Sequence, residues 1–318
     1  MLGGSLAMHI PDGFLSVPVA AILWLLSAGV IAYALVRVRE DLGERQVPLM
    51  GVVAAAIFAG QMLNFPVAGG TSGHLVGAAI AAIILGPWAA ILVMTSVVSI
   101  QALLFQDGGL LALGGNIFNM GIVSVAVAYA LYALVRRVSS GQRLGMLAGA
   151  FAAGWLSLFV SSLAVALQLA ASGASTASLA VPAMAGIHAV IGVGEGLITL
   201  GAVVFLLASR PDLVRAGAER ATNGALLAGG GLVVALALVL LSPWASANPD
   251  GLERAAGDLG LLDRGQDAPF NIFAGYEIPG INDPALATVL AGVVGTLIVF
   301  GVSFAVAYAR RKRTGATN

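Results

Sequence analysis

Nine apolar runs recur along this chain and constrain its fold more than any other feature. The hydrocarbon core of a bilayer is about 30 Å thick, so a helix that crosses it needs about 20 apolar residues. Only 9% of the residues are charged, against about 25% in an ordinary soluble domain. We therefore predict an all-α, polytopic membrane protein with spans at Val17–Val36, Leu49–Phe65, His74–Leu85, Trp88–Leu104, Ile117–Val135, Leu144–Leu169, Val181–Leu207, Ala225–Leu241 and Ala285–Ala309.

The third run is short, and Gly86 and Pro87 separate it from the fourth. These two runs could therefore also form a broken or re-entrant pair, an arrangement that often lines binding sites. The runs are continuously apolar rather than alternating, which excludes the strands of a β-barrel. Because the chain has no cysteine, any metal must be held by nitrogen, oxygen or thioether sulfur.

The basic residues predict the orientation, because cytoplasmic loops are enriched in Lys and Arg near the helix ends. With nine crossings, thirteen of the fifteen basic residues fall on one face. We expect a protein of the cell membrane, surrounded by lipid, with its N-terminus outside and its C-terminus cytoplasmic. The outer face is acidic, and an anionic entrance raises the local concentration of cations.

Three histidines occur, and the predicted topology places all of them in the outer half of the protein. His9 precedes the first run, His74 opens the third, and His188 lies about two turns into the seventh. Polar groups at membrane depth are costly and usually functional, and imidazole is a common ligand of Ni²⁺, Co²⁺ and Zn²⁺. For any single histidine, a structural hydrogen bond is as good an explanation as metal binding. The position of all three in the same half of the protein favours a metal-binding site.

Glu195 is the acidic residue that we place inside a span, seven residues after His188. Seven residues put both side chains on one helix face but about 10 Å apart along the axis, too far to share one ion. We therefore interpret Glu195 as a supporting or structural group. Asp12 and Asn64 are further candidates for a second shell or a cation path, although interhelical hydrogen bonding explains Asn64 more readily. The glycines at residues 192–196 follow no strand, so they indicate close helix packing rather than a nucleotide loop.

Three motifs resemble the CbiM/NikM family, the substrate-binding components of energy-coupling-factor transporters for cobalt and nickel. They are Met8-His9-Ile10-Pro11-Asp12-Gly13-Phe14-Leu15, Gly73-His74-Leu75 and the segment from His188 to Thr199. The tail, with Asn248-Pro249-Asp250-Gly251-Leu252-Glu253-Arg254, is similar to the PDGLE domain, a CbiN-like partner. The resemblance implies a seven-helix substrate-binding domain at 8–208, a cytoplasmic linker at 209–223 and a two-helix domain with a long outer loop at 224–318.

The resemblance also implies the metal ligands. They are the terminal amine of Met8, the amide nitrogen and imidazole of His9, and the imidazole of His74. A site of four nitrogens in a plane favours Ni²⁺ over tetrahedral Zn²⁺, and Co²⁺ remains equally possible. Because seven residues precede Met8, we expect residues 1–7 to be a non-native or misassigned start, since a peptide nitrogen lacks the lone pair of a free amine.

The function that the resemblance implies is capture of Co²⁺ or Ni²⁺ as transported substrate, for cobalamin biosynthesis or for nickel enzymes. The chain has no Walker motif, no HExxH and no nucleophile elbow, so we expect no enzyme activity, no organic cofactor and no nucleic-acid partner. The partners implied are a transmembrane coupling protein and two cytoplasmic ATPases. The alternative from another class is a stand-alone secondary permease or channel, in which Asp12, His188 and Glu195 form a cation path.

Overall fold

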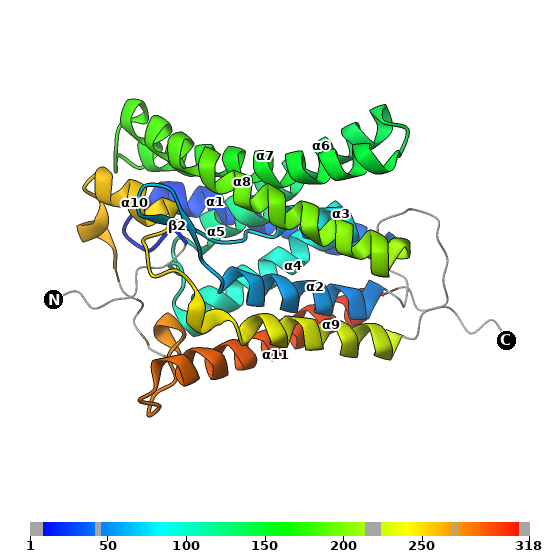
Figure 1. The fold of residues 1–318 in the computed structure, drawn as a ribbon. Helices are drawn as coiled ribbons and strands as arrows, with labels where there is room; N and C mark the ends of the chain where they lie inside the picture. The colour runs from blue at the N-terminus through cyan, green and yellow to red at the C-terminus, as the bar shows by residue number, and fades with distance from the viewer. Residues whose placement is uncertain are drawn as a thin grey trace.

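The computed structural model describes residues 9–41, 46–213 and 224–311, apart from residues 267, 269 and 271. Within these ranges the chain is almost entirely helical (Figure 1). The elements are α1 (Val17–Asp41), α2 (Gln46–Gln61), β1 (Phe65–Val67), β2 (Thr71–Gly73), α3 (Ala78–Leu85), α4 (Pro87–Ile100), η1 (Gln101–Phe105), α5 (Leu113–Asn116), η2 (Ile117–Val123), α6 (Ser124–Val138), α7 (Arg143–Ala171), α8 (Ala177–Ser209), η3 (Pro211–Leu213), α9 (Gly224–Val239), η4 (Ser242–Trp244), α10 (Gly251–Asp258), η5 (Leu262–Arg264), η6 (Ala274–Tyr276) and α11 (Pro284–Arg310).

The prediction of an all-α, polytopic membrane protein is confirmed. Seven helical segments of the described chain are long and apolar enough to cross a membrane, and α2 is a shorter apolar helix beside them. Their lipid-compatible surface is visible in α1, where Val17, Leu25 and Val36 are each more than half exposed. An apolar surface that extends along a helix of 25 residues is suited to contact with lipid.

The third predicted span is wrong in its details. Helix α2 ends at Gln61, and the chain then forms the antiparallel hairpin of β1 and β2. His74 does not open a helix, because α3 begins only at Ala78 and has 8 residues. A helix of that length covers about 12 Å, less than half of a bilayer core. The extended residues 74–77 and α3 therefore make this passage together, and Gly86 then leads the chain into α4.

A buried carboxylate makes this extended passage possible. Glu195 on α8 is fully buried and accepts hydrogen bonds from the backbone N–H groups of Val76, at 2.8 Å, and Gly77, at 3.0 Å. Backbone outside a helix is tolerated at membrane depth only where protein groups satisfy it. These hydrogen bonds to Glu195 hold the segment that carries His74 in a fixed position.

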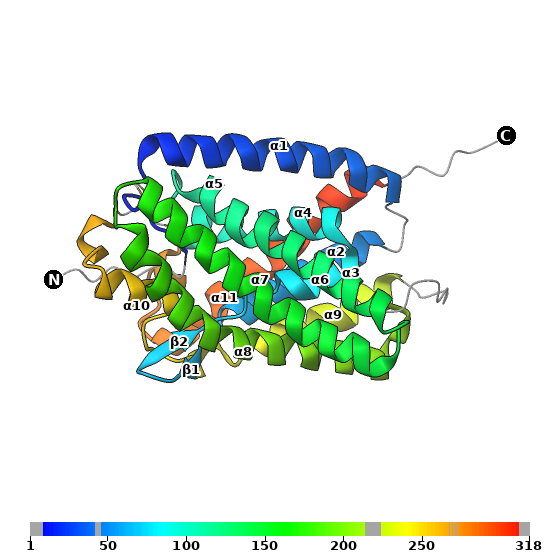
Figure 2. The same ribbon diagram turned by 90° about the horizontal axis from the view of Figure 1, so that it is seen from above.

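The two ends of the bundle carry different elements (Figure 1). One end carries α10 and the hairpin of β1 and β2, and we call it the site end. At the other end, the basic end, α1 and α8 finish and α7 begins. Figure 2 shows α1 along one flank of the bundle, with the hairpin and α8 on the other. The described basic residues at or next to the helix termini of the basic end are Arg37, Arg39, Arg136, Arg137, Arg143, Arg210, Arg310 and Arg311.

Small residues bring the helices close together. A Cβ atom on Gly196 would come 2.9 Å from the Phe151 ring of α7, and one on Gly192 would come 2.9 Å from Trp155. On α11, a side chain at Gly295 would collide with Phe58 of α2. Glycine at these positions lets neighbouring helices gain van der Waals contact, which drives helix association in lipid. The two long helices after residue 223 therefore pack onto the rest of the bundle through α2.

Candidate metal centre

The segment around His9 is fastened to the site end through backbone and side-chain bonds. Asn116 accepts a hydrogen bond from the Ile10 N–H and donates one to the Ile10 carbonyl oxygen, both at 3.0 Å. Asp12 accepts from the backbone N–H groups of Leu110, at 3.0 Å, and Ala112, at 2.9 Å. These four bonds fix the chain on both sides of Pro11. His9 is thereby held 2% exposed beneath the surface of the site end.

His9 presents one ring nitrogen without a partner. Its Nδ1 lies 3.1 Å from the carbonyl oxygen and 2.9 Å from the carboxylate oxygen Oδ1 of Asp107. Because a carbonyl oxygen can only accept, Nδ1 carries the proton and donates it. The Nε2 atom is buried and has no hydrogen-bond partner. A histidine whose other nitrogen donates to a carboxylate is the usual arrangement of a metal ligand.

The Asp107 carboxylate is ionised. Burial disfavours its charge, but the attraction of His9 and the hydrogen bonds from His9 and Tyr276 outweigh burial and lower the pKa of Asp107. For His9, burial favours the neutral ring, yet the same carboxylate raises the pKa of the imidazole. When the ring is neutral, its proton lies on Nδ1, which donates to Asp107, and the lone pair is on Nε2.

His74 faces His9 across a short gap. The two ring centroids are 6.0 Å apart and the rings are nearly perpendicular. A neutral imidazole in this position can offer a lone pair to a cation.

A carboxylate from the tail lies beside His74. Asp250 caps α10 by accepting a hydrogen bond from the Glu253 N–H at 2.8 Å through its Oδ1 atom. Its Oδ2 atom is buried without a hydrogen-bond partner and lies 3.7 Å from the Nδ1 atom of His74. Burial, followed by the nearby Glu253, raises the pKa of Asp250 to about 8. A buried carboxylate of this kind is stabilised by a cation that enters the site.

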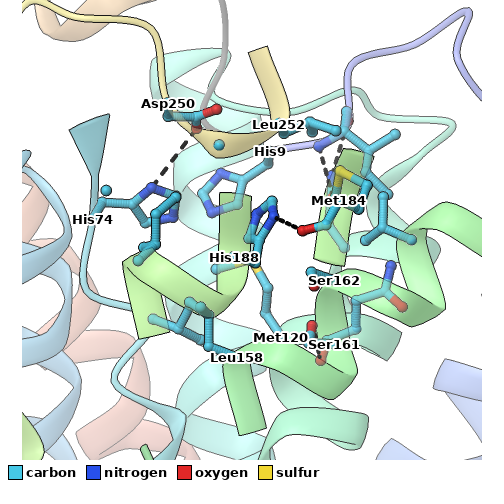
Figure 3. A pocket seen from close by; sticks show the side chains of 18 residues that line it. His9, His74, Met120, Leu158, Ser161, Ser162, Met184, His188, Asp250 and Leu252 are labelled. Atoms are coloured by element: carbon cyan, nitrogen blue, oxygen red, sulfur yellow. Dashed lines mark hydrogen bonds and ion pairs between the residues drawn. The ribbon is translucent and has the colours of Figure 1, made fainter. Parts of the chain in front are cut away.

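His188 is the third imidazole at the site (Figure 3). Its Nδ1 donates to the carbonyl oxygen of Met184 at 2.8 Å, one turn back on α8. The Nε2 atom therefore carries the lone pair, and it faces the start of α10. A Cβ atom on Gly251 would come 2.8 Å from this nitrogen, so only glycine permits α10 to approach so closely.

A cavity of about 70 Å³ lies between these groups (Figure 3). This space holds an ion or a few water molecules, since one water needs about 10–15 Å³ of such volume. Its wall combines the three imidazoles and Asp250 with thioether and hydroxyl groups deeper in the bundle. The lining side chains with polar or sulfur atoms are His9, His74, Asn116, Asn119, Met120, Ser161, Ser162, Met184, His188 and Asp250.

The remaining candidates lie outside this cavity. Asp12 and Glu195 hold backbone segments, as described above. The backbone carbonyl oxygen of Asn64 accepts from the Ser246 N–H at 2.8 Å, so Asn64 joins the loop after α2 to the tail. Met8 lies outside the described residues. Within the described residues, no three His, Asp or Glu side chains are grouped to hold a metal ion by themselves, so backbone nitrogen or water is needed to complete a coordination shell.

Asp107, Asp250 and Tyr276 are the groups that sequence reasoning missed. Asp107 was indistinguishable from the other acidic residues of the outer face, because it follows η1, far from any histidine in the sequence. The π-helical η1 and η2 both adjoin the site, and π-turns often occur at functional sites. For Asp250 a signal existed, since it lies within the motif that marks the tail.

Comparisons with known proteins identify the family of both parts of the chain. Residues 9–213 match the family described as the cobalt uptake substrate-specific transmembrane region, CbiM, and residues 224–312 match the PDGLE domain. The chain belongs to the CbiM family. The predicted resemblance to CbiM/NikM and to the PDGLE domain is thus confirmed.

Related proteins extend over both parts of the chain. A NikMN fusion of Archaeoglobus fulgidus is 40% identical over 95% of this chain and 99% of its own length. The fused nickel transport protein NikMN of Rhodobacter capsulatus is 35% identical over 80% of this chain and 78% of its own. The cobalt transport protein CbiM of Sorangium cellulosum is 35% identical and covers 65% of this chain and 94% of its own.

A solved structure shares the fold of the CbiM region. The crystal structure of a truncated transition metal transporter aligns with a TM-score of 0.57 and 34% identity, covering 63% of this chain and 99% of the other. Together with the apolar helices, these relatives identify the chain as a metal transport protein of the membrane.

Proposed function

We propose that this CbiM-family chain is the substrate-capture component of an energy-coupling-factor importer for Co²⁺ or Ni²⁺. The observation that carries the proposal is the pair of buried imidazoles at one cavity. His9 and His74 both line the cavity, and their ring centroids lie 6.0 Å apart. Nitrogen donors without any thiolate suit Ni²⁺ and Co²⁺.

The family resemblance implies further ligands beside this pair. The terminal amine of Met8 and the amide nitrogen of His9 would bind the same ion as the ring of His74 and the Nδ1 atom of His9, because only Nδ1 can close a chelate ring with the amide of its own residue. In that arrangement Nδ1 would exchange its hydrogen bonds to Asp107 for the metal. The amide of Ile10 is already bonded to Asn116, so it does not compete for the metal. Asp250 would then balance part of the charge of the dication.

The charges of the two ends support one orientation in the cell membrane. Basic residues close to helix ends mark the cytoplasmic side, so the basic end would face the cytoplasm and the site end would face outward. The N-terminal segment would then lie outside and α11 would end inside. Cations would enter the cavity past α10, whose N-cap Asp250 and residues Glu253 and Asp258 are acidic.

In this proposal the chain transports metal only together with partner proteins. A transmembrane coupling protein and two cytoplasmic ATPases would supply the energy, because the sequence carries no Walker motif. The captured metal would serve cobalamin biosynthesis or nickel enzymes.

Uptake of radiolabelled Co²⁺ or Ni²⁺ by cells tests this requirement. We expect accumulation when the chain is produced together with its coupling protein and both ATPases, and loss of accumulation when the ATPase catalytic residues are inactivated. Equal uptake by the chain alone, at equal expression, would support the secondary permease instead and would overturn the importer proposal.

Asp250→Asn is expected to weaken binding of Ni²⁺ or Co²⁺ by about tenfold. The substitution keeps an oxygen to cap α10, because Asn and Asp cap helices equally well, but it removes a carboxyl group, 3.7 Å from His74, that a bound cation would ionise. Removal of an outer partner of a metal site typically costs 10–100-fold in affinity. Calorimetric titration of the purified protein measures the change.

Asp283→Asn is the matched control for this variant. Asp283 caps α11 in the same way, accepting from the Leu286 N–H at 2.9 Å, and it is exposed. We expect its variant to bind metal as the wild type does. If the two variants bind metal equally, the charge of Asp250 does not act on the site.

A further inference from the structure

Helix α10 of the tail forms part of the wall of the metal cavity. Its N-cap Asp250 and its first two residues, Gly251 and Leu252, line the cavity. The rest of α10 packs against α8, and Ala255 and Ala256 on it are buried. In the view of Figure 3, Asp250 and Leu252 lie on one side of the imidazoles, and the deeper part of the cavity lies on the other. The start of α10 therefore covers the cavity at the site end of the bundle.

The segment before α10 is fastened to the hairpin that leads to His74. Ser72 of β2 is fully buried, and it makes two hydrogen bonds to this segment. Its backbone N–H donates to the carbonyl oxygen of Pro249 at 2.8 Å, and its hydroxyl donates to the carbonyl oxygen of Asn248 at 2.8 Å. These bonds hold the entry to α10 over the hairpin, and packing then sets how closely the helix approaches α8.

Glycine is what allows this close approach. A Cβ atom on Gly251 would come 2.6 Å from the Cδ1 atom of Ile191 and 2.8 Å from the Nε2 atom of His188. The Ile191 side chain also meets the hairpin, since a Cβ atom on Gly73 would come 2.5 Å from its Cγ2 atom. Ile191 is stiff because it is branched at Cβ, and the His188 ring is held by its hydrogen bond to Met184. A larger residue at 251 would therefore push α10 away from α8.

The cavity wall must move to let a cation reach His9, which is 2% exposed. The other walls are held more firmly, because Asn116 and Asp12 tie down the N-terminal segment, and α7 and α8 are long helices of the bundle. Helix α10 has 8 residues and is joined to irregular chain at both ends. Short elements with few contacts open at a lower free energy than the rest of a fold. Of these walls, α10 is the one that opens with the least disruption.

We propose that α10 is a lid over the metal cavity and that Gly251 sets how tightly this lid closes. The lid opens to admit a cation and closes over it, so the free energy of opening governs how fast the ion leaves. Alanine at 251 would favour the open lid, because its Cβ atom has no room beside Ile191 and His188. The inference rests on the proposed function for the identity of the ion, whereas the closure is a property of the fold.

A thiol inside the cavity measures opening of the lid without any metal. The chain has no cysteine, so Ser162→Cys, at the cavity wall on α7, gives the full-length protein a single thiol. Its rate of modification by a water-soluble cationic methanethiosulfonate reagent reports how often the cavity is open. This rate is compared in Gly251→Ala and in the matched control Gly257→Ala. Gly257 also lies on α10, neither glycine has a positive φ, and a Cβ atom on Gly257 would meet only Leu262, at 3.6 Å.

We expect Gly251→Ala to speed modification at position 162 about tenfold, because overpacking a tight contact costs enough free energy to shift the opening equilibrium by that factor. Gly257→Ala should leave the rate unchanged. Ser303→Cys, buried on α11 near the basic end, reports general loosening, and its rate should not rise in Gly251→Ala. An unchanged rate at position 162 in Gly251→Ala overturns the lid. An equal rise in Gly257→Ala, or at position 303, overturns it as well.

Release of Ni²⁺ into excess chelator, followed by stopped flow, tests what the lid does to the ion. Gly251→Ala, without any added thiol, should release Ni²⁺ about tenfold faster than the wild type, and Gly257→Ala should release it at the wild-type rate. If modification accelerates but release does not, the lid does not retain the ion, and that part of the proposal is overturned. If the wild type does not bind Ni²⁺, the proposed function fails, and the thiol measurement still decides whether α10 is a lid.

Discussion

His74→Ala is expected to abolish stoichiometric binding of Co²⁺ or Ni²⁺ while the protein stays folded. The segment that carries His74 is held by the bonds from Val76 and Gly77 to Glu195, and neither bond involves the imidazole. The side chain lines the cavity, so its removal takes away a nitrogen donor without opening a helix contact. Since loss of an outer partner already costs 10–100-fold, loss of a ligand should cost more than about 100-fold.

Calorimetric titration of the purified variant measures this loss, and its thermal unfolding shows whether the fold is kept. His188→Ala is the informative companion, because His188 lines the same cavity but its Nδ1 is used by Met184. We expect His188→Ala to weaken binding less than His74→Ala does. Unchanged binding in His74→Ala would remove this residue from the site, and a larger loss in His188→Ala would move the ion toward α8.

Protein that begins at Met8 is expected to bind Co²⁺ or Ni²⁺ at least about 100-fold more tightly than protein that retains Met1–Ala7. A free α-amine has a pKa near 8, so a metal displaces its proton at modest cost near neutral pH. A peptide nitrogen gives up its proton far less readily. His9 is buried at the cavity wall and Ile10 is tied to Asn116, so a terminal amine one residue before His9 would start within reach of the same ion.

Both forms are verified by intact mass and titrated with metal at one pH. Protein that begins at Met8 but carries an acetylated amine is the matched control, since acetylation removes the amine and adds little bulk. We expect the acetylated form to bind as weakly as the extended form. Equal affinity of all three would contradict the terminal-amine mechanism and would leave His9, His74 and His188 as an all-imidazole site.

The membrane-spanning helices could be predicted closely because the reason for them is local. A segment in lipid must satisfy its own backbone and present apolar side chains, and both demands are met residue by residue along the sequence. The first helix was predicted to begin at Val17, where α1 begins, and the seventh span was predicted as Val181–Leu207, inside α8. The family resemblance followed from three short motifs around His9, His74 and His188.

The sequence alone thus determined the class of protein, its apolar helices, its family and the nitrogen donors available for a metal. Only the tertiary structure decided which side-chain oxygen atoms lie next to those nitrogen donors. Asp107 lies 98 residues after His9, yet their side chains are 2.9 Å apart, and Tyr276 and Asp250 come from a different domain. It also decided that His74 lies on extended backbone, because Glu195, 119 residues after Val76, satisfies the N–H groups there. Contacts between distant segments depend on how the helices pack together, and no local periodicity encodes them.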